Sequence, residues 1–98
     1  MREEFIGTVR FLYQVGGKTR SLQPALRSVL QICEESQGRV ASLEKGRHDG
    51  RLAMYVTIES ERRFETKEEC ESWIQNVASR LTRNFPSRGS WVIGATAV

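Results

Sequence analysis

Apolar residues in this chain recur with two different periods, and the order of those periods limits the possible folds more than any other feature. Residues 5–15 alternate apolar and polar side chains, as a strand with one buried face does. Gly16 and Gly17 end that run. Residues 21–37 instead repeat apolar side chains at helical spacing, and the expected core-facing set is Leu22, Leu26, Val29, Leu30 and Cys33.

Local signals place the ends of these elements. Ser21 is a residue type that caps helices, and Gly38 is one that ends them. Residues 39–45 and 52–59 are predicted to form a hairpin, because the link between them contains the pair Asp49-Gly50. Such a pair favours a tight turn, whose two central residues often need positive φ.

A second helix is predicted to begin at Thr66, whose hydroxyl can accept from the backbone of Glu69 in a capping box. Its expected inner stripe is Cys70, Trp73, Ile74, Val77 and Leu81. Residues 84–89 are an exit loop containing Pro86, and residues 91–98 are a last strand.

The predicted order is therefore β-α-β-β-α-β within a single domain, residues 1–98. This order is typical of the α+β ferredoxin-like sandwich, a four-stranded antiparallel sheet with two helices on one face. Right-handed crossovers would place the first strand beside the third.

Composition is that of an ordinary globular domain, with 39 % apolar and 28 % charged residues. The longest apolar stretches have the length of strands, and the first residues contain no apolar signal segment, so we expect a cytoplasmic protein that does not enter a membrane. Cys33 and Cys70 fall on apolar helix faces and are expected to be core thiols. With one histidine, the chain offers too few ligands for a metal site.

Motifs that would carry catalysis are incomplete in this sequence. The run Gly16-Gly17-Lys18-Thr19 resembles a phosphate loop, but Leu12 occupies the position where that motif requires an earlier glycine. His48 and Asp49 lack a third group and lie in a predicted turn. The sequence therefore predicts a binding domain without enzymatic activity and without a cofactor.

Nucleic-acid binding through the sheet is one alternative. The net charge is +3, and many RNA-binding modules have this topology, with exposed aromatic side chains on the central strands. Here Tyr55 could stack on a base, but Ala53 occupies the other stacking position. One aromatic residue is a weak signal for this function.

Four short segments resemble an ACT domain over about the first sixty residues: Pro24-Ala25-Leu26, Val29-Leu30, Gly38-Arg39-Val40 and Ser42-Leu43-Glu44-Lys45-Gly46-Arg47. ACT domains are small amino-acid-sensing modules, and the most similar type is the regulatory domain of aromatic amino acid hydroxylases and prephenate dehydratases. Those domains have a Gly-Ala-Leu motif at the first helix and an Ile-Glu-Ser-Arg-Pro motif on the second strand. Pro24 replaces the glycine of the first motif.

The resemblance implies a homodimer with an amino-acid site near the start of the first helix. The residues that it implicates are Gly16, Gly17, Pro24, Ala25, Leu26, Leu43 and Glu44. Independently, free amides at a helix start suit a carboxylate. Glu44 could accept the ammonium group.

A protein-interaction domain without a small ligand is the other alternative. The sheet face without helices would be partly apolar, and such a surface usually marks an interface. Ala53 and Thr96 fall on that face, and the residues expected to form the interface are Ile6, Leu12, Tyr55 and Val92.

Overall fold

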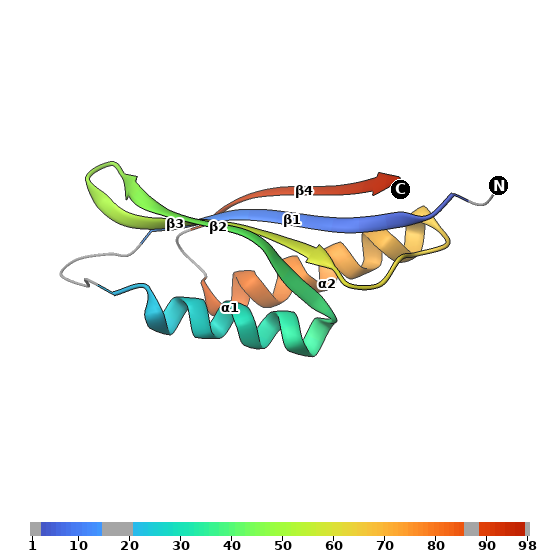
Figure 1. Cartoon of the computed structure of the whole chain (residues 1–98), viewed down its shortest axis with the longest axis horizontal. Coiled ribbons are helices and arrows are strands. Elements are labelled where there is room, and N and C mark those ends of the chain that lie inside the picture. The colour runs from blue at the N-terminus through green and yellow to red at the C-terminus, as the bar shows by residue number, and fades with distance from the viewer. Residues whose placement is uncertain (1–2, 15–20, 86–88, 98) are drawn as a thin grey trace.

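The computed structural model describes residues 3–14, 21–85 and 89–97, and for His48 and residues 89–97 it describes the backbone alone. Figure 1 shows the six elements in the predicted order. They are β1 (Phe5–Gln14), α1 (Gln23–Ser36), β2 (Gly38–His48), β3 (Arg51–Ser60), α2 (Lys67–Asn84) and β4 (Gly89–Ala97). The predicted α+β class, with two helices and an antiparallel sheet, is confirmed.

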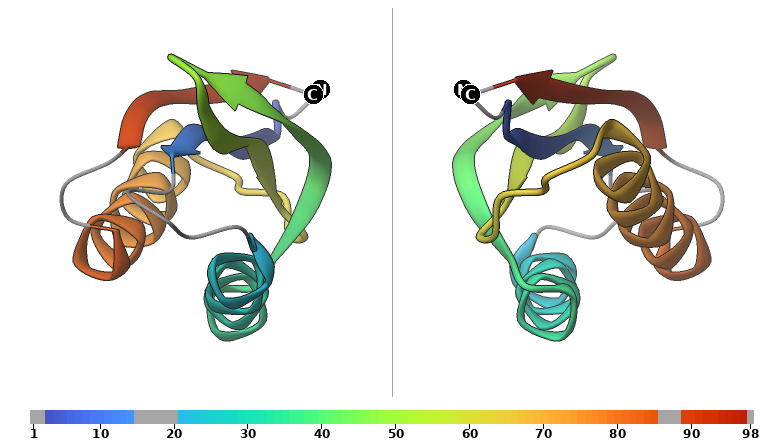
Figure 2. Two further views of the ribbon diagram at one scale, coloured as in Figure 1. Left: turned by 90° about the vertical axis from the view of Figure 1, so that its left-hand side faces the viewer. Right: turned by 90° about the vertical axis from the view of Figure 1, so that its right-hand side faces the viewer.

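The strands pair in the order β2-β3-β1-β4, and every pairing is antiparallel. The first strand lies beside the third, as the right-handed crossover rule requires. Both helices lie on the same side of the sheet, which Figures 1 and 2 show clearly. In the part of the chain that the structure describes, no helix covers the other side, which we call the open face.

The core fills the space between the sheet and the two helices. Val9 of β1 and Ile58 of β3 are completely buried there, and Trp73 of α2 lies against β1. A Cβ atom built on Gly7 would overlap the Trp73 indole, so only glycine leaves room for this ring. The indole Nε1 donates a hydrogen bond of 2.7 Å to the Ser36 carbonyl at the end of α1. Trp73 thereby joins the sheet to both helices.

The predicted turn is present, and it is tighter than the predicted link. Asp49 has φ of 50° and Gly50 has φ of 76°, so both turn residues have the positive φ that such a pair favours. The strands therefore run longer than expected and include Gly46, which the sequence had assigned to the link. A register shift between Val40 and Ser42 marks a bulge in β2.

The predicted inner stripe of α1 was partly wrong. Leu30 is 51 % exposed, whereas Ile32, which was not in the predicted set, is buried at 4 %. The two residues lie about 200° apart on the helix, so one of them must face solvent. The contacts of α1 with α2 and β2 turn the helix so that Ile32 is the one that faces the core.

Both predicted ends of α1 also differ from the structure. Leu22 occupies the cap position without a side-chain cap, and the Ser21 hydroxyl accepts a 3.2 Å hydrogen bond from the Gln23 amide. At the other end, Gln37 takes the left-handed conformation with φ of 57°. Gly38 is instead the first residue of β2, where a Cβ would lie 3.2 Å from both Ile58 and Trp73. Its small size serves packing rather than helix termination.

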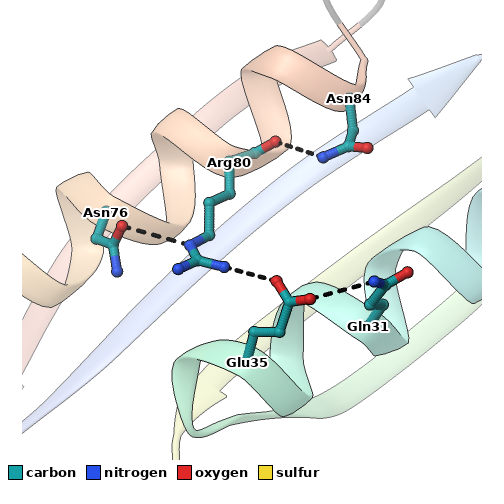
Figure 3. A network of polar contacts seen from close by, with 5 residues as sticks. All are labelled: Gln31, Glu35, Asn76, Arg80 and Asn84. Carbon is teal, nitrogen blue, oxygen red and sulfur yellow. Dashed lines mark hydrogen bonds and ion pairs between the residues drawn. The ribbon is translucent and has the colours of Figure 1, made fainter.

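Polar contacts join the outer sides of α1 and α2 (Figure 3). Arg80 of α2 forms a 2.7 Å ion pair with Glu35 of α1. Gln31 donates to the Glu35 carboxylate at 3.1 Å, and the Asn84 amide donates to the Arg80 carbonyl at 2.9 Å. At the start of α2, the Thr66 hydroxyl accepts from the Glu69 amide at 3.2 Å, which confirms the predicted cap.

Candidate functional site

The open face brings together side chains that are far apart in the sequence. Strand pairing places Arg10 opposite Thr57, and Thr57 opposite Ser42, so these three residues form one row across β1, β3 and β2. The next row on the same face consists of Leu12, Tyr55 and Glu44. The rows are two residues apart along the strands, so their side chains are neighbours.

A hollow of about 400 Å³ lies over these two rows. Six of the residues that line it are on the open face: Arg10, Leu12, Ser42, Glu44, Tyr55 and Thr57. The lining combines a cation, an anion, three hydroxyl groups and an apolar centre. This mixture can bind a ligand with two charged groups and an apolar part, as a small-molecule site requires.

Arg10 and Glu44 are both exposed, and they carry the opposite charges of the hollow. Among the described residues neither of them forms an ion pair. By contrast, Arg39 is paired with Glu59 at 2.9 Å, and Arg63 with Glu4 at 3.3 Å. The two charged groups of the hollow are therefore available to a ligand.

Tyr55 is 40 % exposed and lies at the centre of the hollow, with Leu12 half-buried beside it. Ala53, expected on the uncovered surface, is fully buried. It is placed between Gln14 and Gly46 of the neighbouring strands. A small side chain between two neighbouring strands is easily covered. Among the side chains that the structure describes on β1, β2 and β3, Tyr55 is the exposed aromatic one.

The residues implicated by the ACT resemblance lie on two sides of the sheet. Pro24, Ala25 and Leu26 are in the first turn of α1, on the helical side, and Ala25 is buried. Leu43 packs against the core, whereas Glu44 is on the open face. Gly16 and Gly17 lie outside the described residues. Within one chain, Glu44 is thus separated from the helix start by the sheet.

The start of α1 offers few free amides to a carboxylate. The Gln23 amide already donates to the Ser21 hydroxyl, and Pro24 has no amide proton. The amide donors expected at a helix start are correspondingly reduced here.

The four expected interface residues belong to the open face. Ile6 and Leu12 are half-buried on β1, and Tyr55 is exposed on β3. The backbone register places Val92 of β4 opposite Arg10. Arg10, Ser42 and Thr57 belong to none of the sites predicted from the sequence. Alternation in the sequence puts Arg10 on this face, but only the strand register shows that it shares a hollow with Glu44.

The two thiols belong to the core, as predicted. Cys33 and Cys70 are free and buried. Burial, with the nearby Glu61 carboxylate adding to it, raises the pKa of the Cys33 thiol to about 11. Burial and then Glu71 raise the pKa of Cys70. In residues 3–14, 21–85 and 89–97, no three His, Cys, Asp or Glu side chains are grouped to hold a metal ion. None of the described helices is long and apolar enough to cross a membrane.

No protein-family model matches this sequence, and no curated protein matches it. Solved structures do share its fold. The designed protein Foldit4 is 17 % identical, with a TM-score of 0.56, over 96 % of this chain and 97 % of that one. A hydantoinase/carbamoylase family amidase from Burkholderia ambifaria is 10 % identical, with a TM-score of 0.64, over 95 % of this chain and 27 % of the amidase.

A second hydantoinase/carbamoylase family amidase, from Burkholderia multivorans, is 8 % identical, with a TM-score of 0.63, over 96 % of this chain and 28 % of that chain. This chain spans just over a quarter of the two amidases. At such identities the likeness shows the fold alone, and a shared fold does not carry a function. The chain has a ferredoxin-like α+β fold, which is compatible with an ACT domain.

Proposed function

We propose that this domain is a non-catalytic, ACT-like regulatory module that works as a homodimer and binds a free amino acid in the hollow of the open face. The observation that supports this most strongly is the placement of Arg10 and Glu44, of opposite charge, in one hollow around Tyr55. A free amino acid is a zwitterion with an apolar or polar side chain, and this lining complements all three parts.

Each group of the hollow has a distinct role in this proposal. The Arg10 guanidinium binds the α-carboxylate, for which its planar array of donors is well suited. The Glu44 carboxylate accepts from the α-ammonium group. Tyr55 and Leu12 contact the ligand side chain, so large apolar and aromatic amino acids are favoured.

The spacing is compatible with a small zwitterion. Arg10 and Glu44 are two strands and one row apart. From standard strand geometry this separates their Cα atoms by about 12 Å. Both side chains line the hollow and are exposed, and each is long enough to lean toward a ligand held between them. The volume of about 400 Å³ is near the lower end of small-molecule sites.

The hollow is a better candidate than the start of α1. At the helix start, the Gln23 amide is occupied and Pro24 has none to offer. In the hollow, both charged groups remain without an ion pair in the described part of the chain. Glu44, the residue expected to accept from the ammonium group, lines the hollow and not the helix start.

Binding can be tested by thermal shift and calorimetry against each of the twenty amino acids. We expect a subset to raise the melting temperature by mass action. Arg10→Ala and Glu44→Gln should each weaken binding by about tenfold or more, because each removes a charged hydrogen-bond partner. Arg51→Ala is the matched control, since it removes an exposed arginine of β3 outside the hollow. Equal effects of Arg10→Ala and Arg51→Ala, or no response to any amino acid, would contradict the proposal.

A protein-interaction domain without a small ligand is the second candidate. It is favoured by the apolar part of the open face, where Ile6 and Leu12 are only half-buried. Nucleic-acid binding rests on Tyr55 alone and predicts affinity for random RNA that falls steeply with salt. Both alternatives predict that the amino-acid screen is negative.

A further inference from the structure

The sheet has two edges, and they differ in a way that bears on assembly. The strand order leaves β2 at one edge and β4 at the other. An edge strand presents unpaired amide and carbonyl groups, which can pair with a strand of another chain. Proteins that remain monomeric usually protect such edges with charges, bulges or prolines.

The β2 edge has two of these protections. Its sequence carries charged residues along most of its length: Arg39, Glu44, Lys45 and Arg47. A bulge between Val40 and Ser42 interrupts the regular ladder. A second strand approaching this edge would meet several charged side chains and an irregular backbone.

The β4 edge has neither protection. Its nine residues, Gly89–Ala97, contain no charged residue and no proline. Its register with β1 continues without a shift from the pair Tyr13 and Gly89 to the pair Phe5 and Ala97. Within the described residues, no strand pairs with its outer side. A long, regular and uncharged edge is the kind that pairs with another chain.

We infer that the outer edge of β4 pairs antiparallel with β4 of a second copy of this chain, which makes one continuous eight-stranded sheet. A two-fold axis brings a strand antiparallel to its own copy, and this is the symmetry of most homodimers. An uncharged strand brings no like charges together when it meets itself.

The position of the helices shows which of them would meet in this arrangement. α2 is the helix that contacts β4, whereas α1 contacts β2. Both helices lie on one side of the sheet (Figure 2). In the dimer, the two α2 helices would lie on the same side of the joined sheet, near its centre. The two open faces would form one surface on the other side.

The test is the oligomeric state of the whole chain, measured by analytical ultracentrifugation without ligand. The wild-type chain should be a dimer. The double variant Ser90→Lys, Thr96→Lys should be a folded monomer, because it gives β4 the charges that protect β2. These positions pair with Leu12 and Ile6, so neither is opposite Arg10. Ala41→Lys adds a charge to an exposed position of the other edge and should remain a dimer.

Circular dichroism verifies that each variant is folded. Hydrogen exchange adds a measurement that needs no variant, since alternate β4 amides should exchange more slowly as the wild-type concentration rises. A monomeric wild type, a dimer that persists in the double variant, or dissociation by Ala41→Lys would each overturn the inference. The inference rests on the homodimer of the proposed function: a monomeric wild type would contradict both, whereas a dimer that persists in the double variant would contradict the β4 interface alone. Because no ligand is used, each result is independent of amino-acid binding.

Discussion

On the covered face of the sheet, Val9 and Ile58 are fully buried and pack against the helices, whereas on the open face Arg10 and Tyr55 are exposed. The two sets alternate along the same strands, so Val9 and Arg10 are adjacent residues with different surroundings. Substitutions on the covered face should therefore change stability, and substitutions on the open face should change binding. Each strand can be altered in one property with little effect on the other.

Gly7→Ala should have the largest effect on stability. The new Cβ would overlap the Trp73 indole and lie 3.2 Å from Ile74 Cγ1. Overpacking of this kind should lower the free energy of unfolding by about 3 kcal/mol, measured by urea denaturation. Gly46→Ala is the control, because a Cβ there meets nothing within 4 Å. If both variants lost the same stability, strand propensity rather than packing against Trp73 would be the cause.

Trp73→Phe should have an intermediate effect. It removes the Nε1 donor from a buried 2.7 Å hydrogen bond to the Ser36 carbonyl and leaves a small void. Together these should lower the free energy of unfolding by about 2 kcal/mol. Tyr55→Phe removes a polar group from an exposed ring and serves as comparison, with almost no change expected. A cost for Trp73→Phe as small as that of Tyr55→Phe would show that the indole does not join α1 to the sheet.

Tyr55→Ala should have the smallest effect on stability and a clear effect on binding. The side chain is 40 % exposed, so its removal should change the free energy of unfolding by about 0.5 kcal/mol. Affinity for the amino acid should fall, because the ligand side chain loses its aromatic contact. Denaturation and calorimetry on the same sample separate the two quantities. A large loss of stability would mean that Tyr55 belongs to the core and not to a site.

Local signals were sufficient for much of the fold. Asp49-Gly50 predicted a tight turn because few residues tolerate positive φ, and Thr66 predicted a helix start because its hydroxyl can accept from the Glu69 amide. Both signals act within a few residues. Gly38 was predicted to end the first helix, but its small size instead accommodates Trp73, which is 35 positions away in the sequence. No local pattern contains that contact.

The candidate site was less accessible to sequence reasoning. Glu44 and Tyr55 were each singled out, but for different surfaces, and Arg10 was assigned to none. Their proximity depends on the pairing of β1 with β3 and of β3 with β2. The bulge in β2 also determines which residues of that strand lie on the open face. No residue type in β2 predicted this bulge.

Alternation and helical spacing, which depend on backbone geometry alone, establish the order of strands and helices and the side of β1 that is buried. The rotation of α1, with Ile32 inward and Leu30 outward, follows from the surfaces that the helix packs against. The gathering of Arg10, Tyr55 and Glu44 in one hollow follows from strand register. Both depend on contacts between distant segments, whose energies no short stretch of sequence contains.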